Sequence, residues 1–292
     1  MIKIFKDIKH QTDFDTNGFV VIPVLNFETI NKLKEIYYTE VPQNQITNFA
    51  SSAICSIEKN NSISDTLYNL INPFFNNYLE NYQMIGGSFL IKKNDNGSLG
   101  IHQDNNCVDN TTHVAAFAWT PLEDVNIKNG CMYVIKNSHL FFDNIVSFSY
   151  KNDNIYWKKI PEKYIVPIEM KAGEVLFFKP NIFHGSFKNQ TNNTRIAINS
   201  LITDNNATIT YYVKKDDDTA LQYEISKYAY LNCYKYFSEG MLPEGAIFIK
   251  EISYRNKPID HNILYKALTN KDYPKWKNLY YSIFKSLINE YN

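Results

Sequence analysis

Short runs of β-prone residues, separated by turns rich in Asn, Gly and Pro, dominate the chain from about residue 83 to residue 202. Within these runs apolar residues alternate with polar ones or follow one another, as in strands that are buried on one or both faces. Strands this short and this frequent predict a sandwich or barrel, of which the double-sheet jelly roll is one form. The predicted strands are Met84–Lys92, Val114–Thr120, Cys131–Ile135, Tyr164–Met170, Glu174–Phe178 and Arg195–Thr203.

Helical periodicity precedes this strand-rich region. After a β-prone segment at 18–23, apolar residues recur at every third position over residues 26–37, behind Asn26, a residue type favoured at helix N-caps. A second helix is predicted within residues 62–82, and Pro73 is expected to end or kink it.

Beyond the strands the chain is predicted to be helical again. Thr219–Glu239 and Pro274–Tyr291 each place aromatic and aliphatic residues on one side, as packing helices do; a lid or a dimer contact is the alternative. Leu140–Lys163 is interpreted as a mobile loop near the mouth of a site. The predicted fold class is therefore mainly β with helical additions. A jelly-roll (double-stranded β-helix, cupin-like) domain with N-terminal helices spans residues 1–203, and a helical extension, residues 204–292, packs on the same domain.

Composition argues against several classes of function. Lys+Arg and Asp+Glu number 30 each, so no net charge attracts nucleic acid or an anionic membrane. No apolar run approaches the roughly 20 residues of a spanning helix, and the N-terminus does not resemble a signal peptide. The four cysteines form no CxxC pair, which argues against a disulfide framework or a zinc knuckle. We therefore expect a cytoplasmic protein without nucleic-acid or membrane partners.

Candidate metal ligands stand two residues apart in Gly100-Ile-His-Gln-Asp104. In an extended strand His102 and Asp104 face the same side. A second imidazole, from His184 on a remote strand, would complete three ligands on one face of a metal. This is the two-His-one-carboxylate arrangement of non-haem Fe(II) oxygenases.

A cationic residue downstream of His184 indicates a carboxylate-bearing co-substrate. We predict a hairpin that turns near residues 189 and 190, so that His184 faces Arg195 at about 4.5–5.5 Å between Cβ atoms. Arg binds carboxylates through two parallel hydrogen bonds, and Ser186 shares the face of His184 and adds a hydroxyl.

Five segments, taken in order, carry a resemblance to a known family. They are Asp15–Pro23, His102-Gln-Asp104, Trp119–Asp124, Gly130–His139, and His184-Gly-Ser186 with Arg195 after it. Together they resemble the phytanoyl-CoA dioxygenase-like family of Fe(II)/2-oxoglutarate oxygenases, over roughly residues 13–203.

The resemblance implies a jelly-roll fold with Fe(II) on His102, Asp104 and His184. It also implies 2-oxoglutarate ion-paired to Arg195 with help from Ser186. Relatives often carry a lysine on the strand before the metal motif, which we assign to Lys93, although Lys92 stands beside it. In the loop after the motif, Asn106, Thr111 and Thr112 are candidates for substrate or co-substrate contacts or for plain turn roles, and Thr112 is our choice for the co-substrate.

The function implied is hydroxylation of an unactivated C–H of a small molecule with O2, releasing succinate and CO2. Halogenating relatives have Ala or Gly in place of the carboxylate, whereas Asp104 is present here. An amino acid or a biosynthetic intermediate, free or carrier-bound, is the expected substrate, and the oligomeric state is left open. The alternatives are a cupin-like metal isomerase or lyase that does not use O2, and a metal-free binding or sensor protein.

Other residues receive structural interpretations. His139 is expected to have a structural or entrance role, and His113 to pack or to hydrogen-bond at the start of a strand. Trp119 either packs in the core or lines the substrate pocket.

Overall fold

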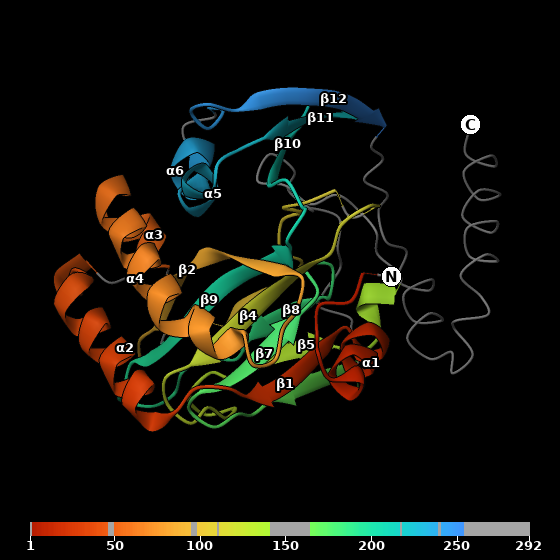
Figure 1. The fold of residues 1–292 in the computed structure, drawn as a ribbon. Helices are drawn as coiled ribbons and strands as arrows, with labels where there is room; N and C mark the ends of the chain where they lie inside the picture. Colours follow the sequence, from red (N-terminus) through yellow and green to blue (C-terminus); the bar gives the residue numbers. More distant parts are fainter. Residues whose placement is uncertain are drawn as a thin grey trace.

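Two antiparallel sheets form the body of the protein, and a third, smaller sheet lies above them in the view of Figure 1. The computed structural model describes residues 2–45, 50–94, 98–109, 111–140, 164–216, 218–238 and 241–253.

The larger sheet has five strands in the order β1-β7-β4-β9-β2, and the facing sheet has four in the order β3-β8-β5-β6. This is the predicted jelly-roll arrangement of a mainly β chain, and the prediction is confirmed. The strands of the larger sheet are β1 (Phe19–Pro23), β2 (Tyr82–Lys92), β4 (Ala115–Pro121), β7 (Glu174–Phe178) and β9 (Arg195–Asp204). Those of the facing sheet are β3 (Leu99–His102), β5 (Met132–Ile135), β6 (Ile165–Ile168) and β8 (His184–Ser186).

The alternation of side chains along the large sheet divides the core in two. On β7, Val175 and Phe177 join a cluster under the N-terminal helices, whereas Leu176 and Phe178 join a cluster shared with the four-stranded sheet. Successive strand residues face opposite sides, so the continuous apolar run of β7 contributes side chains to both clusters. The space between the sheets holds the site described below.

Helices cover the outer face of the five-stranded sheet (Figure 1). They are α1 (Ile8–Asn17), α2 (Phe27–Glu40), α3 (Ser51–Ile54) and α4 (Ile57–Phe75), with a 3-10 turn, η1, at Gln43–Gln45. Asn26 caps α2 as predicted, because its side chain accepts the Thr29 N–H at 2.9 Å. Pro73 lies inside the last turn of α4, which ends two residues later. The apolar residues Ile63, Leu67 and Ile71 of α4, one turn apart, are buried.

The predicted helix at Thr219–Glu239 is wrong for its first part, whereas two short helices occupy much of the rest. Thr219–Glu224 is strand β11, between β10 (Thr210–Lys214) and β12 (Ile247–Ser253), and only the short α5 (Lys227–Leu231) and α6 (Cys233–Ser238) follow. In β11 Ala220 and Gln222 are buried and their neighbours are less so, which is the period of two of a strand. Pairing with β10 and β12 decides the structure here over the helical spacing of the apolar residues. The second predicted helix, Pro274–Tyr291, and residues 141–163 of the predicted loop lie outside the described residues.

The predicted hairpin between His184 and Arg195 is also wrong. Strand β8 pairs with β3 and β5 in the smaller sheet, and β9 pairs with β2 and β4 in the larger one. The segment between β8 and β9 crosses from one sheet to the other. Asn189 fixes its course, because its side-chain amide donates to Lys92 O at 2.9 Å and to Asn193 O at 2.7 Å. Among the described residues, no helix is long and apolar enough to cross a membrane.

Candidate active site

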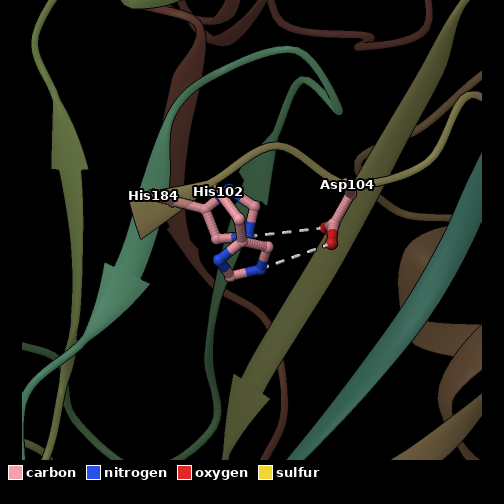
Figure 2. Close-up of side chains that lie close together, drawn as sticks. All are labelled: His102, Asp104 and His184. Carbon is pink, nitrogen blue, oxygen red and sulfur yellow. Dashed lines mark ion pairs between the residues drawn. The ribbon is translucent and has the colours of Figure 1, made fainter. Parts of the chain in front are cut away.

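Three side chains converge between the two sheets. His102 ends β3 and His184 begins β8, and the pairing of these strands sets the two residues opposite each other. Asp104 follows β3, and its backbone N–H donates to Pro180 O at 3.0 Å, in the segment that leads to β8. Figure 2 shows the carboxylate facing both imidazoles. Asp104 Oδ1 is 3.8 Å from His102 Nε2, and Oδ2 is 3.5 Å from His184 Nε2.

The backbone orients both rings in the same way. His102 Nδ1 lies 2.8 Å from Gly100 O, and His184 Nδ1 lies 3.0 Å from Ile182 O. A carbonyl accepts only from a protonated nitrogen, so each Nδ1 carries the proton and each Nε2 lone pair faces Asp104. One potential ligand atom from each of the three residues lies within 4.8 Å of the other two. The set suits a transition metal held on one face.

The environment keeps His184 neutral. Burial lowers its pKa to about 4; His102 adds to this shift, while Asp104 and the Ile182 carbonyl oppose it. Neutral imidazole is the form that binds a metal. At neutral pH His184 therefore needs to lose no proton when a metal binds.

Gly185, between His184 and Ser186, allows β3 and β5 to approach on either side. A Cβ at this position would lie 2.4 Å from Tyr133 Oη and 2.6 Å from Leu99 O. These two atoms are joined by a hydrogen bond of 3.2 Å, so neither is free to retreat.

Gly185→Ala is therefore expected to displace His184, to destabilise the chain by about 1–3 kcal/mol through overpacking and to weaken metal binding. Gly100→Ala is the matched control, because a Cβ there meets nothing within 4 Å. Thermal unfolding and a Mn(II) titration measure both effects. Equal behaviour of the two variants would contradict this role of Gly185.

A buried cationic site lies in the same interior. Arg195 is 5% exposed, and its Nε and Nη1 have no hydrogen-bond partner within the described parts of the chain. Its guanidinium lies over the Trp119 ring, 5.3 Å from the centroid. Lys92, its cross-strand partner, donates from Nζ to Ser186 Oγ at 2.7 Å and to Phe187 O at 2.6 Å. Ser186 thus connects the cationic site to the His184 strand.

The charges at this site call for an anion. Burial, together with the charge of Arg195, lowers the pKa of Lys92 to about 7; burial also brings the pKa of Arg195 down to about 10. The nearby carboxylate of Glu123 is occupied, since it accepts the Ile196 N–H at 2.6 Å, and burial raises its pKa. Unpaired buried donors are costly. A ligand carboxylate on Arg195 and Lys92 would satisfy them, so the residues fit 2-oxoglutarate as co-substrate.

The lysine assigned from the sequence needs correcting. Lys92 faces Ser186 and is 5% exposed, whereas Lys93 lies just past the end of β2 and is half-buried. The pairing of Lys92 with Arg195 decides which of the two faces inward. Thr112 is not part of the cationic site either: it is exposed in a turn, where its hydroxyl donates to Asp109 O at 3.3 Å.

Two residues near the site were missed by sequence reasoning. Asn199 shares the inward face of β9 with Arg195, and its Oδ1 is buried with no hydrogen-bond partner among the described residues. Counting in twos from Arg195 would have found it. Tyr230 of α5 lies near Asp104: burial, followed by Cys107, Cys233 and Asp104, raises its pKa well above the usual value. Short helices of this kind leave no sequence signal that points to the site.

The chain was compared with known proteins. The family described as Phytanoyl-CoA dioxygenase (PhyH) matches residues 14–197. The chain belongs to this family. A phytanoyl-CoA dioxygenase of Arabidopsis thaliana is 32% identical over 106 residues, which is 35% of this chain and 37% of that protein. The matches span 26–37% of the length of the curated family members.

Solved structures share the fold of this family member. The non-heme alpha ketoglutarate dependent carbocyclase SnoK from nogalamycin biosynthesis is 16% identical with a TM-score of 0.50, over 70% of this chain and 86% of SnoK. The epimerase SnoN from the same biosynthesis is 16% identical with a TM-score of 0.53, over 87% of this chain and 95% of SnoN.

Binding of 2-oxoglutarate is expected to take up a proton. With a pKa of about 7, Lys92 is largely neutral at pH 8. A neighbouring anion favours the charged form and so raises the pKa. We expect calorimetry in buffers of different ionisation enthalpy to show proton uptake at pH 8, and affinity to fall as the pH rises above 7. Lys92→Met should abolish the uptake and Lys93→Met should retain it; the reverse pattern would contradict the assignment of Lys92.

Proposed function

We propose that the chain is an Fe(II)/2-oxoglutarate-dependent oxygenase that hydroxylates an unactivated C–H of a small molecule. The substrate C–H and O2 become C–OH as 2-oxoglutarate is converted to succinate and CO2. The single observation that carries this proposal is the unsatisfied Arg195 guanidinium beside Lys92 and Ser186, in the same interior as His102, Asp104 and His184.

Each group has a defined task in this proposal. His102, Asp104 and His184 would hold the iron from one side and leave its other side open to ligands. Iron chelated by a 2-oxo acid supplies the oxidising power, through coupled decarboxylation of that acid and reduction of O2.

Arg195 would bind the distal carboxylate of 2-oxoglutarate as a fork. Lys92 would add the second positive charge, and it holds Ser186 toward the same carboxylate. The Phe178 ring, 4.8 Å from the His184 ring, helps to exclude water.

Hydroxylation is our choice among the outcomes of this chemistry. The family member from Arabidopsis is named a dioxygenase, and SnoK and SnoN are named a carbocyclase and an epimerase. The proposed substrate is an amino acid or a biosynthetic intermediate, free or carrier-bound. The four cysteines, all buried and unpaired, support a reducing cytoplasm as its place.

Succinate release tests the proposal. The chain is loaded with Fe(II) and screened with 2-oxoglutarate and candidate substrates, in air and without O2, while mass spectrometry follows the gain of one oxygen. We expect O2-dependent succinate that one class of substrate stimulates. Substrate conversion without O2 and without succinate would instead support a metal-dependent isomerase or lyase.

A further inference from the structure

The parts of the site can be placed along strand β9, from one end of the sheet to the other. Arg195 begins the strand and Asp204 ends it, ~30 Å away at the rise of an extended chain. Between them, Leu201 pairs with Phe117 of β4, which in turn pairs with Phe178 of β7. Phe178 lies against the His184 ring, so the metal ligands lie alongside the part of β9 near Leu201, between Arg195 and Asp204. The Asp204 end therefore lies beyond the metal, on the side away from the co-substrate.

A hollow with several polar residues in its lining opens at this far end. It has a volume of about 160 Å³ and lies between the loop after the metal motif and the small β10–β12 sheet, which Figure 1 shows above the two main sheets. It is lined by Asp109, Thr112, His113, Thr208, Thr210, Gln222, Ile249 and Lys250.

His113 is held in a fixed orientation at the rim of the hollow. Its Nδ1 lies 3.1 Å from both carboxylate oxygens of Asp204, whose side chain is 3% exposed. Asp204 also accepts the Val114 N–H at 3.0 Å and the Asn206 N–H at 3.2 Å. This leaves Nε2 as the nitrogen of His113 that can bind a ligand.

The charged groups around the hollow already neutralise one another. Lys250 Nζ is 3.0 Å from Asp109 Oδ2, and Asp109 Oδ1 accepts the Thr111 N–H and hydroxyl at 3.1 and 2.6 Å. Asp204 is likewise occupied by His113 and two backbone N–H groups. Neither carboxylate is free for a ligand ammonium, and the one lysine already has a counter-ion. The hollow therefore favours a ligand without charge.

The groups that remain are donors and acceptors of hydrogen bonds. Thr210 is 3% exposed; its hydroxyl lies next to Tyr212, and it has no partner of good hydrogen-bond geometry within the described chain. Gln222 gives its amide N–H to Tyr212 Oη at 3.1 Å, which leaves its carbonyl oxygen as an acceptor. The Thr208 hydroxyl and His113 Nε2 complete the set. At ~30 Å³ per water this space holds about five waters, enough for one small ring.

We propose that this hollow binds a hydroxyl-bearing ring of the substrate, a cyclic polyol or sugar, while the carbon to be oxidised lies at the metal. Only the position of the oxidised carbon at the metal rests on the proposed function; binding of the ring in the hollow does not. Hydroxyl groups both donate and accept, as the mixture of Thr, Gln and His requires. An amino acid or a carboxylate would leave its charge without a partner here.

The test is ligand-observed NMR on the full chain without metal or 2-oxoglutarate, so that its outcome is independent of turnover. The probes are myo-inositol and methyl β-glucoside, with glutamate and acetate as charged counterparts. We expect saturation transfer to the two polyols only, and affinity at least tenfold weaker in Thr210→Val, which keeps shape and removes the hydroxyl. Thr66→Val, on the outer face of α4, is the control, because its hydroxyl bonds only within the helix, to Ser62 O.

Each outcome decides. Three results would contradict the assignment of the hollow as a polyol site. The first is no saturation transfer to the polyols, and the second is transfer that Thr210→Val leaves unchanged. The third is binding of glutamate or acetate that Thr210→Val weakens. Unaltered thermal unfolding of Thr210→Val shows that the variant folds. His113→Phe provides a second variant, which closes the rim and should also abolish polyol binding. Polyol binding without succinate release would contradict the proposed function and support the hollow as a polyol site. Succinate release without polyol binding would support the proposed function and contradict the polyol site.

Discussion

Asp104→Ala is expected to abolish succinate release and metal binding without unfolding the chain. The carboxylate is the only anionic member of the three candidate ligands. Residues that merely support metal ligands cost about 10–100-fold in affinity or activity when changed, so loss of a direct ligand should exceed ~100-fold. In the metal-free protein the Asp104 carboxylate lies 3.5 and 3.8 Å from the two imidazoles and accepts no hydrogen bond shorter than these contacts among the described residues, so its removal should cost little stability.

Thermal unfolding with and without Mn(II) measures this effect. Binding to the native state alone stabilises it by about 2.7 kcal/mol at a hundredfold excess over Kd. The wild-type chain should show that increase and Asp104→Ala should not, although both melt alike without metal. Asp104→Asn, which keeps the shape and removes the charge, is the matched variant. An increase in the melting temperature of Asp104→Ala equal to that of wild type would show that the metal binds elsewhere.

Arg195→Leu is expected to act in opposite directions on function and on stability. The guanidinium is buried and two of its nitrogens have no partner among the described residues, so its removal relieves unsatisfied buried donors and should leave the melting temperature of the metal-free chain unchanged or higher. Truncating one partner of a buried charged pair costs about 2–5 kcal/mol, so 2-oxoglutarate affinity should fall at least ~30-fold.

Anaerobic 2-oxoglutarate titrations of the Mn(II)-loaded chain check this prediction. Arg195→Lys keeps the charge but cannot make two parallel hydrogen bonds to a carboxylate, so its affinity for 2-oxoglutarate should lie between those of wild type and Arg195→Leu. Metal affinity should not change in either variant, because Arg195 is not among the candidate ligands. Unfolding of Arg195→Leu, or undiminished 2-oxoglutarate binding, would assign the guanidinium a structural role instead.

Local patterns along the chain predicted much of the fold. The strand predicted at Glu174–Phe178 is the observed β7, and Cys131–Ile135 differs from β5 by one residue. His102 and Asp104, two residues apart, also lie together, although β3 ends at His102 and Asp104 follows it. These successes share a cause: each depends on residues that are neighbours in sequence.

The predictions that failed depended on which strands pair. The turn-rich stretch after Ser186 is compatible with a hairpin, and only the Asn189 contacts show that the chain crosses to the other sheet. The choice between Lys92 and Lys93 needed the register of β2 against β9. At Thr219–Glu224 the apolar residues fitted a helix as well as a strand, and pairing with β10 and β12 decided in favour of the strand. Such pairings are tertiary and leave little trace in local sequence.

The central claim is that one ion is held by His102, Asp104 and His184 beside a carboxylate site at Arg195. Anaerobic addition of 2-oxoglutarate to the Fe(II)-loaded chain tests it most directly, because chelation of Fe(II) by a 2-oxo acid produces a weak visible charge-transfer band. We expect the band in the wild-type chain, its loss in His184→Ala, and its appearance in Arg195→Leu only at much higher 2-oxoglutarate. An iron-loaded wild-type chain that shows no band at saturating 2-oxoglutarate would contradict the account.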